Sequence, residues 1–239
     1  MGTSADYSAP PNWSTVKSDV TRNGGHAPTP TKARELVRDY ISENGGSDRM
    51  SSGRGQLGNG KTARNAARSL GGFVSAVARD GLDTALRNNG LQDLIGKSVT
   101  ETLLGIVSLC GGSEGDIDSV DARNALSKTM DEVCKDARSP EELETTLTDQ
   151  MHGDKLGGLM IHYFGNYLFE QFCRVFFGQL VQKHGDVKAN SFLNSISDVI
   201  KSGLANETVN MDLTKVNWFG REGNQMAQTI LKNTLVVFE

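Results

Sequence analysis

One stretch, Leu156 to Gly185, constrains the fold of this chain more than any other. It holds five of the nine phenylalanines of the sequence, together with Tyr163 and Tyr167. Its apolar residues recur three and four positions apart, which predicts a helix whose wide apolar arc contacts several neighbours. Such an aromatic stripe can line a cofactor pocket, but large aromatic side chains more often build a core. Polar residues interrupt the stretch before about 18 apolar residues accumulate, so it does not resemble a membrane span. We expect a long, buried central helix.

The rest of the sequence predicts an all-α fold, a multi-helix bundle around this aromatic-rich central helix. Helical periodicity, caps and glycine stops recur, and no clear run of alternating apolar residues predicts a strand. The expected helices cover residues 29–44, 61–79, 81–88, 91–95, 99–109, 118–137, 140–149, 187–204 and 222–237. In the helix over 118–137 we place five residues on the buried face: Val120, Ala125, Leu126, Met130 and Val133.

Two parts of the chain are expected to differ from this bundle. Residues 1–28 contain three of the five prolines and many small polar residues, so they predict a flexible N-terminal arm ahead of a helical domain over 29–239. Within the arm, Trp13, Val16 and Val20 have the spacing of an amphipathic helical turn that docks either on a partner or on the protein's own core. A second segment, at about 45–60, is rich in glycine and serine and is expected to be a loop.

Charge and cysteine content narrow the classes of protein to which this chain can belong. The formal net charge is −4, so no overall basic field points to nucleic acid, and we expect no direct nucleic-acid binding. The odd number of cysteines and the lack of a CxxC motif favour free thiols in a reducing cytoplasm. The N-terminus lacks the charged and apolar regions of a secretory signal. We therefore expect a cytoplasmic protein that has no membrane association.

The sequence has one sharp motif, the match to GxxxxGK[ST] from Gly55 to Thr62. In a P-loop, such residues cradle phosphates and hold magnesium, but the loop must follow a buried strand. Residues 44–54 are polar and rich in turn formers, and they predict no strand. A chain with 27 glycines also produces such a match easily by composition. Nucleotide binding is therefore the least favoured of the functions that we consider.

No other motif of catalysis is found. The four histidines show no metal-binding spacing, so we expect no metal and no cofactor. His162, on the central helix, is expected to be a hydrogen-bonded core or interface residue. The carboxylates of Asp131, Glu132 and Asp136 fall on a solvated helix face and form no recognisable pair. With no nucleophile signature present, we expect that the protein is not an enzyme.

The N-terminus itself carries one reactive group. Met1 precedes Gly2, a residue small enough for methionine aminopeptidase to expose it, and a free α-amine with a pKa of about 8 is partly unprotonated at neutral pH. Myristoylation would require Ser or Thr at position 6, where this chain has Asp6. From the residues alone, the simpler interpretation is that Gly2 only begins a disordered tail.

Several segments together resemble the QatB-type proteins of bacterial Qat anti-phage operons. The arm contributes Gly2-Thr3-Ser4, Pro10-Pro11 and Trp13. The body contributes segments that are spread over most of the chain: 63–73, 90–96, 117–125, 217–223 and 237–239.

This resemblance implies a cytoplasmic defence component encoded beside an ATPase, a QueC-like enzyme and a TatD-like nuclease. It implies that the QueC-like enzyme joins a 7-deazaguanine-type nucleobase to an N-terminal glycine, which is Gly2 here. Thr3, Ser4 and Trp13 would then take part in recognition by the partner. The alternative is a helical scaffold or adaptor that binds defence partners and whose Gly2 is not modified.

Overall fold

The computed structural model describes residues 12–54, 60–112 and 117–239, and over these residues the fold is all-α, as predicted. No strand occurs within the described ranges. The helices are α1 (Trp13–Asn23), α2 (Pro30–Glu43), α3 (Gly46–Ser52), α4 (Lys61–Asp80), α5 (Leu82–Asn88), α6 (Val99–Cys110), α7 (Ile117–Val133), α8 (Pro140–Asp149), α9 (Lys155–His184), α10 (Asp186–Leu204) and α11 (Arg221–Val236), with short 3-10 turns at Gln92–Leu94 and Leu213–Lys215.

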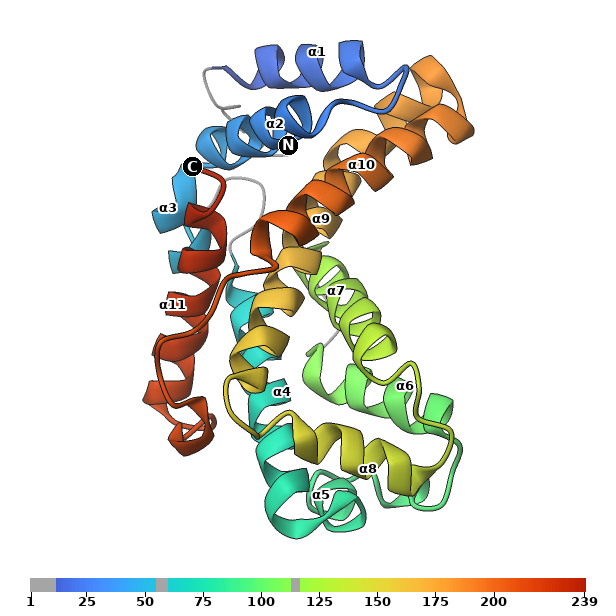
Figure 1. Cartoon of the computed structure of the whole chain (residues 1–239), viewed down its shortest axis with the longest axis vertical. Helices are drawn as coiled ribbons and strands as arrows, with labels where there is room; N and C mark the ends of the chain where they lie inside the picture. The colour runs from blue at the N-terminus through green and yellow to red at the C-terminus, as the bar shows by residue number, and fades with distance from the viewer. Residues whose placement is uncertain (1–11, 55–59, 113–116) are drawn as a thin grey trace, which may run out of the picture.

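The central helix is α9, which confirms the prediction from the aromatic stretch. It runs obliquely through the molecule with α10 alongside it, while α1 and α2 lie at one end and α5, α6 and α8 at the other (Figure 1). It packs against α1, α4, α7, α10 and α11. Five of its aromatic side chains are buried in the core, whereas Phe177 is 42% exposed; the buried ones are Tyr163, Phe164, Tyr167, Phe172 and Phe176. None of the helices in the described parts of the chain combines the length and apolar content needed to cross a bilayer.

The segment expected as a loop at about 45–60 instead contains the helix α3, which corrects that expectation. Gly45 and Gly53 bound the helix in the left-handed region, with φ of 95° and 87°. Met50 is buried in the core, and the carboxylate of Glu239 accepts hydrogen bonds from the Ser47 backbone N (2.6 Å) and Oγ (2.8 Å). This cap comes from a residue 192 positions away, so local composition could not reveal it.

Helix α7 also differs from its expected form. Its last residue is Val133, and Val120, which we placed in the core, is 54% exposed. Polar side chains, including Asp118 and Asp121, occupy the buried face instead and meet partners on α9. Ala125, Leu126 and Met130 are buried as predicted, so the apolar periodicity failed at Val120, because polar residues share the buried face of α7.

Two of the segments that carry the family resemblance pack against each other. A Cβ atom at Gly71 would lie 2.5 Å from Cδ2 of Trp218, and one at Gly72 would lie 2.5 Å from Cζ of Phe219. The Trp218 side chain is buried, whereas Phe219 is 69% exposed. The paired glycines therefore allow the segment 217–223 to lie directly on α4.

Candidate functional site

The first described residue, Asn12, is held on the helical body by a residue of α2. The backbone N and the side-chain Nδ2 of Asn12 both donate to the carboxylate of Glu43, at 3.1 Å each. Glu43 is the last residue of α2, so the place where residues 1–11 join the body is set by this contact. Gly2, Thr3 and Ser4 lie outside the described residues.

Trp13 anchors α1 in the core of the protein. Its side chain is 5% exposed, and its ring centroid lies 5.8 Å from that of Phe176 and 6.3 Å from that of Tyr40. Val16 and Val20 are buried on the same face of α1. Of the two docking alternatives, the structure therefore supports the protein's own core, and the indole of Trp13 is not displayed to a partner. Residues 13–23 of the expected flexible arm thus form a docked helix, which corrects that expectation for this part of the arm.

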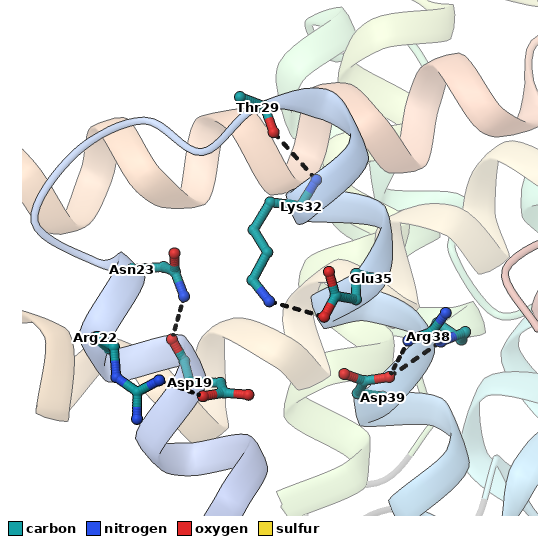
Figure 2. A network of polar contacts seen from close by, with 8 residues as sticks. All are labelled: Asp19, Arg22, Asn23, Thr29, Lys32, Glu35, Arg38 and Asp39. Atoms are coloured by element: carbon teal, nitrogen blue, oxygen red, sulfur yellow. Dashed lines mark hydrogen bonds and ion pairs between the residues drawn. The ribbon is translucent and has the colours of Figure 1, made fainter.

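The outer faces of α1 and α2 are polar. Figure 2 shows the side chains, and each bond drawn joins residues of the same helix or of its cap. In α1 the guanidinium of Arg22 lies 3.2 Å from Asp19, and in α2 the ammonium of Lys32 lies 2.8 Å from Glu35. Exposed pairs of this kind contribute about 0–1 kcal/mol each. The attachment of α1 to the body therefore depends mainly on its buried apolar residues, on Asn12, and on the contact of 2.7 Å between His184 Nε2 of α9 and the Thr21 carbonyl oxygen of α1.

The GxxxxGK[ST] match does not have the context of a P-loop. Residues 55–59 lie outside the described parts, but Gly60 and Lys61 are described, and Lys61 begins α4. The described residues ahead of the motif form the helix α3, where a P-loop would have a strand. A Cβ atom at Gly60 would collide with the Met50 carbonyl oxygen and lie 2.9 Å from Leu231. The start of α4 is therefore packed closely against α3 and α11.

A buried polar network joins α7 to α9. The Tyr167 hydroxyl donates to Oδ1 of Asp118, and Gln171 Nε2 donates to the Tyr167 hydroxyl at 2.8 Å. Burial, together with the nearby Asp118 carboxylate, raises the pKa of Tyr167 well above its ordinary value. These residues therefore act as hydrogen-bonding groups that fix the two helices.

An ion pair extends the same interface. Nε of Arg174 lies 2.7 Å from Oδ2 of Asp121. Burial raises the pKa of Asp121 to about 6, although the hydrogen bond from Arg174 lowers it, and the charges of Asp118 and Glu170 raise it further. Asp121 thus changes its charge within a mildly acidic range of pH.

A cavity of about 380 Å³ lies between α9 and α10 and is bounded by α7. We call it the α9–α10 cavity. On its lining, the Glu132 carboxylate lies 2.7 Å from His162 Nε2 through one oxygen and 2.7 Å from Lys201 Nζ through the other. His162 is hydrogen-bonded, as expected, and Glu132, which was expected on a solvated helix face without a partner carboxylate, is 41% exposed and binds these two basic side chains. Burial raises the pKa of Glu132, but Lys201 and His162 outweigh this effect and hold the pKa below its usual value.

No pattern in the sequence indicates this group of three residues. Glu132, His162 and Lys201 come from α7, α9 and the last turn of α10, and no local spacing connects them. The two glycines of α9 on the lining, Gly158 and Gly165, were visible only as interruptions of the apolar stripe. Where a Cβ atom at Gly158 would lie, nothing comes within 4 Å.

The described residues thus form a helical protein with an anchored N-terminal segment and a polar-edged cavity. The family model for the Qat anti-phage system associated protein QatB matches residues 45–238, and the chain belongs to this family. This confirms the resemblance found in the sequence, and it identifies the chain as a component of the Qat anti-phage system. Comparisons with curated proteins and with solved structures find no match.

Proposed function

We propose that this protein is the non-catalytic acceptor of the Qat system, a cytoplasmic substrate of a QueC-like enzyme encoded in the same operon. That enzyme would join a 7-deazaguanine-type nucleobase to the exposed α-amine of Gly2. The unprotonated amine forms a bond to the activated carbon of the base that the enzyme supplies. The activating group leaves with its electron pair, and the amine nitrogen loses a proton.

The observation that carries this proposal is the anchoring of the chain at Asn12 and Trp13. Gly2 lies ten positions before Asn12, and an extended chain spans at most about 3.3–3.6 Å per residue. Gly2 can therefore lie no more than about 35 Å from Asn12. The QueC-like partner would have to dock with its active site inside this radius, near the polar outer faces of α1 and α2. Thr3 and Ser4 would enter the active site beside Gly2.

Substitution of Gly2 tests the proposal. Gly2→Trp prevents removal of Met1 and blocks the amine, so we expect loss of both conjugation and phage protection while the helical content stays unchanged. Gly2→Ala is the matched control, because alanine is also small enough for Met1 to be removed. Full phage protection by Gly2→Trp would overturn the proposal.

The alternative is a scaffold that binds the enzyme, the ATPase or the TatD-like nuclease of the operon without being modified. Deletion of residues 1–10, with a new initiator methionine, keeps Trp13 and the body and separates the two functions. A scaffold retains complex formation and phage protection after this deletion, whereas an acceptor loses protection.

A further inference from the structure

The α9–α10 cavity has a polar edge that offers hydrogen-bond acceptors and donors side by side. Each oxygen of the Glu132 carboxylate has one described partner, Lys201 or His162, and a carboxylate oxygen can accept about two hydrogen bonds. The Lys201 ammonium carries three N–H donors, of which Glu132 takes one. The edge therefore has capacity for a ligand that both donates and accepts.

The remainder of the lining is mostly apolar, with Glu207 as a further acidic residue. Ile161, Ile200 and Leu204 are buried and contribute hydrocarbon surface, and Gly158 leaves space on α9. The one buried polar residue, Asn166, is 4% exposed, and its amide nitrogen donates to Thr129 Oγ1 at 2.9 Å. A volume of about 380 Å³ lies within the range of small-molecule pockets. A small ring with apolar faces and one polar edge suits this volume and lining.

The order of hydrogen-bond donors and acceptors along the polar edge of the cavity decides which kind of ring fits. A guanine-type base has two adjacent N–H donors beside a carbonyl oxygen. The donors match the two oxygens of Glu132, and the carbonyl matches the ammonium of Lys201, a pairing that lysine makes with guanine O6 in nucleic acids. An adenine-type base instead turns a ring nitrogen acceptor toward the carboxylate. The lone pair of that nitrogen then faces a lone pair of a carboxylate oxygen, and no hydrogen bond forms between them.

We propose that the α9–α10 cavity binds a guanine-type base through Glu132 and Lys201, with the ring between the apolar side chains. The base is either free or attached to Gly2 of the same chain, and only the second source rests on the proposed function. In that case the cavity holds the modified arm against the body.

Calorimetric titration of the full-length, unmodified protein with 7-deazaguanine tests the cavity directly, with adenine as the comparison. We expect saturable binding of 7-deazaguanine, and binding of adenine that is weaker by about tenfold or more, since a hydrogen bond to a charged group is lost. Glu132→Gln should weaken the binding of 7-deazaguanine by a similar factor. Glu35→Gln, which removes a carboxylate on the exposed face of α2, is the matched control.

A second variant separates loss of binding from loss of folding. Gly158→Leu fills open space on the lining and favours the helix, so it should abolish binding without lowering the melting temperature. Absence of binding by the parent protein would overturn the inference. So would equal affinities for the two bases, or unchanged affinity in both variants.

The same titration of protein purified from the whole operon separates this inference from the proposed function. If the base on Gly2 occupies the cavity, modified protein should bind added 7-deazaguanine more weakly than unmodified protein does. Modified and unmodified protein that bind equally well would restrict the site to free bases. If Gly2 is never modified but the unmodified protein binds 7-deazaguanine, only the proposed function fails. If Gly2 is modified but no form binds the base, only the cavity inference fails.

Discussion

Removal of the indole of Trp13 should release α1 from the body without unfolding the rest of the protein. Trp13 is almost fully buried between Tyr40 and Phe176, and truncation of a buried Trp to Ala costs about 3–5 kcal/mol. Helix α1 has only two further buried apolar residues, Val16 and Val20, and the polar contacts of Figure 2 do not tie it to α2. Most of this cost should therefore appear as local opening of α1.

Native-state hydrogen exchange measures this opening. Each 1.4 kcal/mol changes an equilibrium constant tenfold, so Trp13→Ala should reduce amide protection in α1 by about a hundredfold to a few thousandfold. Protection in α9 should change far less. Thr15→Ala, on the exposed face of α1, is the control and should leave protection nearly unchanged. Equal loss of protection in α1 and α9, or no loss in α1, would refute this account of the anchor.

Three further predictions concern the body. The pKa of Asp121 is about 6 in the folded protein against an ordinary 3.8, so the folded state holds this proton more tightly than the unfolded state does. The stability of wild type relative to Asp121→Asn should therefore fall as pH rises from about 4 to about 6, as measured by urea unfolding at each pH. Gly71→Ala should destabilise by about 1–3 kcal/mol because the added methyl meets a buried indole. Gly72→Ala meets an exposed phenyl ring that can move aside, so the gain in helix propensity should make it nearly neutral in the same assay. Glu239→Ala removes the acceptor from Ser47 and should cost about 1 kcal/mol in thermal unfolding, whereas an unchanged melting temperature would show that the cap is not needed.

The sequence predicted the elements whose signals are local. The aromatic stretch marked α9, the Pro140 start marked α8, and the spacing of Trp13, Val16 and Val20 marked the buried face of α1. In each case the residues that decide the element lie within a few turns of one another. The family resemblance likewise rested on continuous segments, and the family match confirmed it.

The features that the sequence did not predict depend on distant contacts. Helix α3 was hidden because its cap is Glu239 and its buried side chain is Met50 in a glycine- and serine-rich segment. On α7, Ala125, Leu126 and Met130 are buried as predicted, but Val120 was placed wrongly. The buried Asp118 is instead stabilised by Tyr167, a partner on another helix. The α9–α10 cavity was missed for the same reason, since its polar residues meet only after three helices pack.

The mass of the N-terminal peptide tests the central claim most directly. The protein should be purified once after expression alone and once after expression with its whole operon, and the peptide that begins at Gly2 should be measured in both samples. The acceptor function predicts a nucleobase adduct on Gly2 in the operon sample only. An unmodified glycine in both samples, with the QueC-like enzyme shown to be active, would contradict it and leave a helical scaffold.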